Sequence, residues 1–128
     1  MIEIGLIGFG NVGQDVYRIL NENGSLISKR IGQPIYIKKI AVRSIEKYLD
    51  IVPETSLLTT NVDEIINDPN ISIVIEVIGG ESPALEYITS ALTNKKHVVT
   101  ANKEVISKHK KHFFKMAQTN GIDICFEA

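Results

Sequence analysis

The fold of this chain is decided near its N-terminus by the stretch Gly5-Leu6-Ile7-Gly8-Phe9-Gly10-Asn11-Val12-Gly13. An apolar run over residues 2–7 predicts a buried strand, and the apolar residues that follow at steps of three and four predict a helix. Glycines spaced as GxGxxG between a strand and a helix are typical of a dinucleotide-binding turn. Gly8 permits the tight turn, Gly10 lets a pyrophosphate approach the backbone, and Gly13 lets the helix pack closely. A turn without a ligand is the alternative interpretation.

Outward from this stretch, strand and helix patterns alternate along the chain. Strands are predicted over residues 2–7, 35–42, 57–60, 71–78, 97–100 and 122–126. Helices are predicted over residues 12–30, 64–66, 83–94 and 103–120, the third with Ser82 as N-cap and Pro83 as first residue, and residues 44–56 are predicted to be a surface loop. This alternation predicts an α/β fold, a three-layer Rossmann-type doubly wound parallel sheet of about six strands in the order 3-2-1-4-5-6.

Composition is that of one soluble globular domain. The chain has 128 residues, of which 44% are hydrophobic and 23% charged, which excludes intrinsic disorder. No apolar run is long enough to span a bilayer, and we find no signal peptide. With 14 basic and 15 acidic residues, no net field points to nucleic acid or a membrane surface. The single cysteine, Cys125, fits a cytoplasmic setting and is predicted to be a buried apolar filler.

The end of the second predicted strand bears on the choice of dinucleotide. NAD sites place an acidic residue there for the ribose hydroxyls. Here the segment reads Ala41-Val42-Arg43-Ser44 and contains no acid. Arg43 could stack on adenine and pair with a 2′-phosphate, which favours NADP weakly over NAD and leaves both open.

Two further segments are expected at the same edge of the sheet. Gly79 and Gly80 follow the fourth predicted strand and would face the crevice beside the glycine-rich turn. Lys103 follows the fifth, where its ammonium could stabilise negative charge that develops during hydride transfer. An exposed lysine at a helix start is the alternative, although the helix dipole disfavours a cation there.

Residues 95–115 contain seven lysines and three histidines but only one acid, Glu104. We interpret this stripe as a solvated helix face rather than a phosphate-binding surface. His109 and His112 have no Cys, Asp or Glu beside them in the sequence, so no metal site is predicted.

Together these segments resemble the N-terminal cofactor domain of homoserine dehydrogenase, over essentially all 128 residues. The most specific parts of the resemblance are Gly79-Gly80-Glu81-Ser82-Pro83-Ala84 and Thr100-Ala101-Asn102-Lys103. The resemblance implies an oxidoreductase that interconverts L-homoserine and L-aspartate 4-semialdehyde with NAD or NADP, in threonine and methionine biosynthesis.

The resemblance also implies site residues. By resemblance, cofactor contacts fall on Phe9, Gly10, Asn11, Val12, Arg43, Gly80, Thr100, Ala101, Asn102 and Lys103, in addition to Gly8, Gly13 and Gly79, which the glycine spacing and the sheet topology already indicate. Lys103 matches the active-site lysine of the family. Glu127 matches a residue that helps bind a monovalent cation, but the other ligands would lie beyond Ala128, so no metal is assigned. Some NADP-using members carry a second basic residue at positions 57–60, and Leu57-Leu58-Thr59-Thr60 here weakens the NADP preference.

In the family, the acidic residues that bind substrate and a second catalytic lysine come from a following domain, which residues 1–128 do not include. We therefore expect residues 1–128 to be an NAD(P)-binding domain that binds cofactor without turnover. The complete enzyme is expected to be a cytoplasmic homodimer acting on a small-molecule substrate. A stand-alone nucleotide-sensing or partner-binding module, and the first domain of another NAD(P)-dependent dehydrogenase, are the alternatives.

Overall fold

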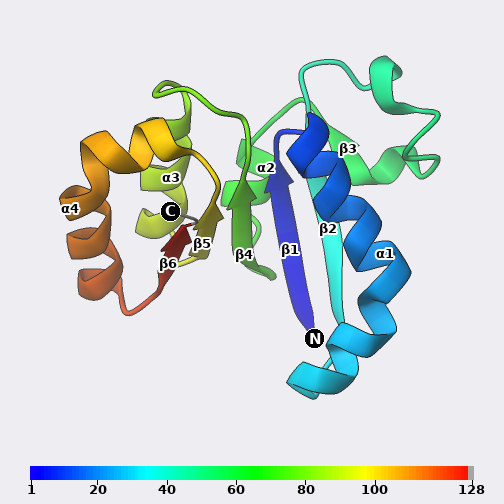
Figure 1. Ribbon diagram of the computed structural model, residues 1–128, viewed down its shortest axis with the longest axis horizontal. Coiled ribbons are helices and arrows are strands. Elements are labelled where there is room, and N and C mark those ends of the chain that lie inside the picture. Colours follow the sequence, from blue (N-terminus) through cyan, green and yellow to red (C-terminus); the bar gives the residue numbers. More distant parts are fainter. Residues whose placement is uncertain (127–128) are drawn as a thin grey trace.

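In the computed structural model, which describes residues 1–126, six parallel strands form one sheet in the order β3-β2-β1-β4-β5-β6 (Figure 1). The strands are β1 (Ile2–Ile7), β2 (Ile35–Ala41), β3 (Leu58–Thr59), β4 (Ile71–Glu76), β5 (His97–Thr100) and β6 (Ile124–Phe126). The predicted strand order is confirmed, although four of the six strands are one or two residues shorter than predicted. From β1 the chain adds β2 and β3 toward one edge of the sheet, and from β4 it adds β5 and β6 toward the other. The strand order therefore reverses between β1 and β4.

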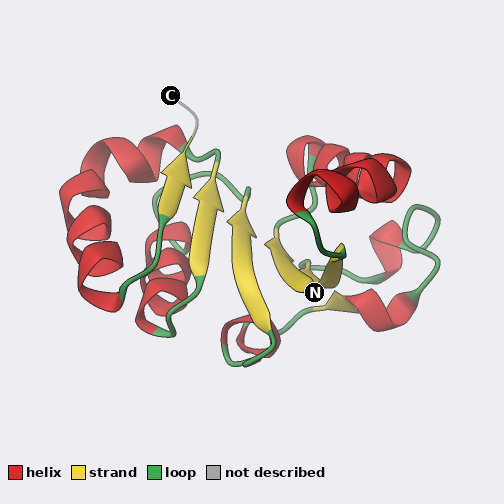
Figure 2. Ribbon diagram, turned by 90° about the horizontal axis from the view of Figure 1, so that it is seen from below, coloured by secondary structure: helices red, strands yellow, loops and turns green. Residues whose placement is uncertain are grey.

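The helices are α1 (Asn11–Ile31), α2 (Asp63–Ile66), α3 (Ala84–Thr93) and α4 (Lys103–Asn120). α1 lies on one side of the sheet and α2 on the other (Figures 1 and 2). The two sides have separate cores, one built around Leu6 and Ile40 and the other around Ile88 and Phe113. This arrangement is the predicted three-layer fold. Within residues 1–126, no helix has the length and apolar character needed to cross a membrane.

The start of α3 differs from the prediction. Pro83, not Ser82, is the N-cap, and the helix begins at Ala84. The Ser82 hydroxyl contacts the Glu86 carboxylate at 3.0 Å, because a charged acceptor attracts this donor more strongly than a neutral group would. By contrast, α4 has a side-chain cap, in which Asn102 Oδ1 accepts from the Val105 N–H at 3.1 Å.

The predicted surface loop over residues 44–56 is largely exposed, but it contains short 3₁₀ turns and one completely buried side chain that the sequence did not indicate. The segment contains a 3₁₀ turn, η1 (Glu46–Tyr48), and the last residues of the segment begin a second 3₁₀ turn, η2 (Thr55–Leu57). Val52 is completely buried, and the Tyr48 ring packs edge-on against Phe9 with 5.2 Å between ring centres. Burial of these apolar groups holds the segment against the α1 side of the sheet.

Cys125 was predicted to be buried, but it is exposed. It pairs in register with Val99, which is 41% exposed. The neighbours of both residues along their strands, including Val98 and Ile124, point to the opposite face and pack under α3 and α4. Among the described residues, no helix covers the Cys125 face of β5 and β6, because α1 packs beside β2.

Lys96 belongs to the stretch of residues 95–115 that was interpreted as a solvated helix face, but its side chain is buried. Only 4% of the residue is exposed, and its ammonium donates to the carbonyl oxygens of Asp68 (2.5 Å) and Ile71 (2.7 Å). Burial lowers the pKa of Lys96, and the nearby Asp68 carboxylate opposes that shift. Lys96 therefore ties β5 to the turn that leads into β4, at the edge of the sheet away from the glycine-rich turn.

Candidate cofactor site

The site is built around the turn that follows β1. Gly8 has a φ of +102°, and a Cβ there would lie 2.6 Å from Cγ2 of Ile78. Its N–H donates to the Ala41 carbonyl at 3.1 Å, and the Val77 N–H donates to the Ile7 carbonyl at 3.0 Å. The turn is thus fixed between the carboxyl ends of β2 and β4, and only glycine fits at its centre.

The other two glycines of the motif differ in what surrounds them. A Cβ on Gly13 would meet the Gly8 carbonyl oxygen at 2.5 Å, so Gly13 allows α1 to pack directly on the turn. Apart from Gly10 itself and its two chain neighbours, no atom of the described residues lies within 4 Å of a Cβ built on Gly10, which lines a pocket. Space at Gly10 is therefore left for a ligand rather than filled by the protein.

The start of α1 suits a phosphate group. Gly10 is the N-cap, no side chain within residues 1–126 caps the helix, and the first turn contains no acid. The first N–H groups of a helix have no partner inside the helix, and they carry the positive end of its dipole. An anion that enters beside Gly10 would meet these donors.

A pocket of about 680 Å³ opens at this edge of the sheet. Of the predicted cofactor residues, Gly8, Phe9, Gly10 and Arg43 line it. The remaining lining residues are Ile7, Ala41, Val42, Ser44, Lys47, Tyr48, Thr60, Val62, Val77, Ile78, Pro83 and Tyr87. No Asp or Glu among residues 1–126 lines the pocket. Sequence reasoning missed Lys47 and Tyr48, because the segment that carries them shows no periodic pattern.

A buried carboxylate organises the loops beyond β4 and β5. Glu76, the last residue of β4, is fully buried. Its side chain accepts from the Thr100 hydroxyl (2.5 Å), the Ile78 N–H (3.0 Å) and the Asn102 amide (3.4 Å). These three donors replace the water that burial removes. A single acid in a run of β-branched residues was the signal in the sequence for such a partnered group.

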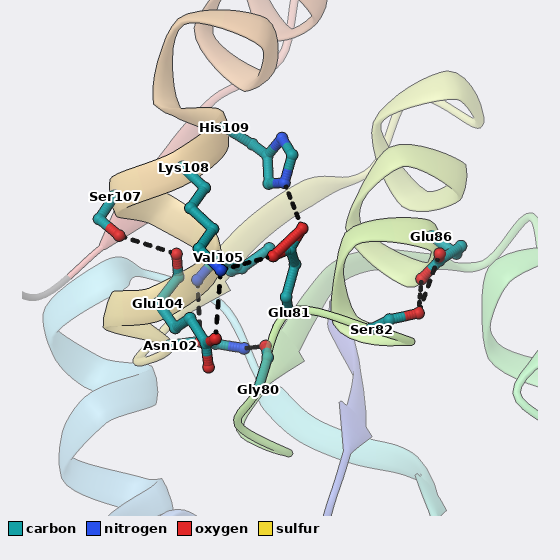
Figure 3. Close-up of polar contacts among 10 residues, drawn as sticks. All are labelled: Gly80, Glu81, Ser82, Glu86, Asn102, Glu104, Val105, Ser107, Lys108 and His109. Carbon is teal, nitrogen blue, oxygen red and sulfur yellow. Dashed lines mark hydrogen bonds and ion pairs between the residues drawn. The ribbon is translucent and has the colours of Figure 1, made fainter.

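The segment after β4 is also fastened to α4, as Figure 3 shows. The Asn102 amide donates to the Gly80 carbonyl at 2.6 Å, and the Glu81 carboxylate lies 2.8 Å from Lys108 Nζ and 3.3 Å from His109 Nε2. The hydrogen bond from Lys108 lowers the pKa of the Glu81 carboxyl, with a smaller effect from His109. These contacts join the two segments that the sequence placed on the nicotinamide side.

The predicted site residues therefore fall into two groups. Lys103 is the exposed first residue of α4, next to the buried Asn102. Within the described chain, the predicted residues that do not line the pocket are Asn11, Val12, Gly13, Gly79, Gly80, Thr100, Ala101, Asn102 and Lys103. Glu127 lies outside the described residues. Residues 1–126 contain no cluster of three or more metal-ligating side chains.

The strand order reverses between β1 and β4, and beside that point lie the glycine-rich turn and the start of α1, which no side chain of the described residues caps. This combination defines a Rossmann-type dinucleotide-binding domain. The family model described as homoserine dehydrogenase, NAD binding domain, matches residues 8–127. The chain belongs to this family.

Relatives and solved structures agree with that assignment. The chain is 40% identical over 127 residues to a homoserine dehydrogenase of Bacillus subtilis, covering 99% of this chain and 29% of that protein. A homoserine dehydrogenase structure from Thiobacillus denitrificans superposes with a TM-score of 0.93 at 40% identity, covering 98% of this chain and 29% of that one. One from S. aureus gives 0.91 at 39% identity, with 99% and 32% covered. The chain thus spans about a third or less of the length of these relatives.

Proposed function

We propose that this chain supplies the cofactor-binding part of an enzyme that interconverts L-homoserine and L-aspartate 4-semialdehyde, with NADP(H) preferred over NAD(H). The observation that carries the proposal is the pocket in which the glycine-rich turn and Arg43 meet. Family membership supports the reaction. We also propose a cytoplasmic homodimer for the complete enzyme.

Within this proposal, the cofactor pyrophosphate lies beside Gly10, on the free N–H groups of Asn11, Val12 and Gly13. Arg43 binds the 2′-phosphate of NADP, and Ser44 adds a hydroxyl beside it. The absence of an acidic lining residue within residues 1–126 supports this preference, because a carboxylate would hydrogen-bond the ribose diol and repel a phosphate.

The nicotinamide side is assigned to the segments that Glu76 and Asn102 hold together. The cofactor, when bound, supplies or accepts the hydride. In this proposal Gly79, Gly80 and residues 100–102 shape that side, and Lys103 holds the oxygen of the substrate and stabilises its developing negative charge. The remaining substrate contacts would come from a part of the enzyme that residues 1–128 do not contain.

Calorimetric titration of the chain with NADPH and NADH tests the cofactor proposal. We expect both to bind, NADPH more tightly, and no turnover of homoserine. Arg43→Asp should reverse the preference toward NADH. Absence of any heat with either cofactor would refute the binding proposal. If the coding sequence continues beyond Ala128, an assay of the longer protein with homoserine distinguishes an enzyme from a nucleotide-sensing module.

A further inference from the structure

The 3₁₀ turn η1 places a second cation in the pocket. Lys47 and Tyr48 both line it, together with Arg43 and Ser44. The Lys47 ammonium lies 5.5 Å from the centre of the Tyr48 ring, in a cation–π arrangement. Tyr48 in turn packs edge-on against Phe9 of the glycine-rich turn. Lys47 therefore stands on a turn that is anchored to the cofactor loop.

The backbone keeps this turn in place. The N–H groups of Ile51 (3.0 Å) and Val52 (2.9 Å) both donate to the Tyr48 carbonyl. Because Val52 is completely buried, displacing η1 would expose an apolar side chain of the core. The position of Lys47 thus follows from the fold, although the side chain itself is exposed.

Arg43 and Lys47, which line one wall of the pocket, have no acidic partner among the described residues. Glu46 precedes Lys47 in the chain, but it does not line the pocket. Two free cations at one wall are complementary to a dianion, and a phosphate monoester carries about 1.5 to 2 negative charges near neutral pH.

From these observations we infer that Lys47 is a second specificity-determining residue for the 2′-phosphate of NADP(H), acting with Arg43. The inference rests on the proposed cofactor binding and goes beyond it, because it assigns part of the phosphate recognition to η1. Arg43 supplies a planar fork of N–H donors, while Lys47 supplies a point charge on a flexible stem. Residues 57–60 contain no basic residue, so η1 provides the second charge from a different segment.

The test compares ligands that differ only in the 2′-phosphate. The chain is titrated calorimetrically with 2′,5′-ADP against 5′-AMP, and with NADPH against NADH. Lys47→Gln should weaken 2′,5′-ADP and NADPH about three- to tenfold while 5′-AMP and NADH change by less than about twofold. Lys47→Arg should retain the preference. In the unmodified chain, the difference in affinity between ligands with and without the 2′-phosphate should shrink as salt is raised from about 0.1 M to about 1 M, because salt screens exposed charges.

The matched control is Lys29→Gln, since Lys29 lies in the last turn of α1, away from the pocket. It should leave all four affinities unchanged, and thermal melts should show that each variant is folded. If Lys47→Gln weakens all four ligands equally, or none of them, the inference is wrong although the proposed cofactor binding stands. If the unmodified chain binds none of the four, the proposed function itself fails.

Discussion

The clearest quantitative prediction compares alanine at two glycines of the same motif. Gly13→Ala places a methyl group 2.5 Å from the Gly8 carbonyl oxygen, which is backbone and has little room to move. Beyond its two chain neighbours, the methyl group of Gly10→Ala meets no atom of the described residues within 4 Å, and the φ of −73° at this position is compatible with alanine. The two substitutions are chemically identical, so any difference between them arises from their surroundings.

The expected magnitudes follow from this geometry. Overpacking at Gly13 should cost about 1–3 kcal/mol of unfolding free energy, partly offset by the better helix propensity of alanine, about 1 kcal/mol. At Gly10 the weaker N-cap and the reduced entropy of the unfolded chain oppose each other, so stability should change by less than about 0.5 kcal/mol. A methyl group at the pocket wall should instead weaken NADPH binding about tenfold or more, since it blocks the approach of the pyrophosphate.

Thermal melts followed by circular dichroism, together with NADPH fluorescence titrations, measure both effects on the same samples. We expect Gly13→Ala to lose several degrees of Tm, at roughly 3–5 °C per kcal/mol for a chain of this size. Gly10→Ala should melt like the unmodified chain but bind poorly. Normal binding by Gly10→Ala would show that Gly10 does not border the pyrophosphate, and an unchanged Tm for Gly13→Ala would contradict the close packing of α1.

Three further predictions concern other parts of the structure. Glu76→Gln replaces an acceptor of three hydrogen bonds and should cost about 1–3 kcal/mol, measured by urea unfolding; equal stability would mean that the buried carboxylate is not needed. Lys103→Ala, made in a longer active protein, should lower kcat about 10²–10³-fold and weaken cofactor binding much less, and an unaltered kcat removes Lys103 from the mechanism. The hydrogen bond from Lys38 holds the pKa of Asp68 below its ordinary value of 3.8. The stabilisation from this pair is therefore present above pH 3.8 and is lost as the pH falls further. Asp68→Asn should lose less stability than the unmodified chain on acidification to about pH 3, and an equal loss would contradict the pairing.

The sequence predicted most of the fold because its elements carry local signals. The glycine-rich turn, the β-branched run over residues 71–78 and the alternation of strands with helices were enough to fix six strands in the right order. Gly32 and Gly121 end α1 and α4 in the left-handed conformation, as expected for residues that follow a helix. These features act within a few residues of the chain, so a single sequence reveals them.

Contacts between distant segments were harder to predict. The Tyr48–Phe9 packing joins residues 39 positions apart, and η1 is too short to show a periodic pattern. The network of Glu76 likewise depends on Thr100 and Asn102, which the strand pairing brings beside it. The sequence identified Thr100 and Asn102 as site residues, but only the structure shows that their side chains are buried against a carboxylate.

The bare face of β5 and β6 has a practical consequence. Cys125 is the only thiol in the chain, and it is exposed on that face in the folded protein. A maleimide dye should therefore attach at one known position without denaturant and without an engineered site. Placed on the half of the sheet away from the pocket that Arg43 lines, such a label would report whether another polypeptide shields β5 and β6.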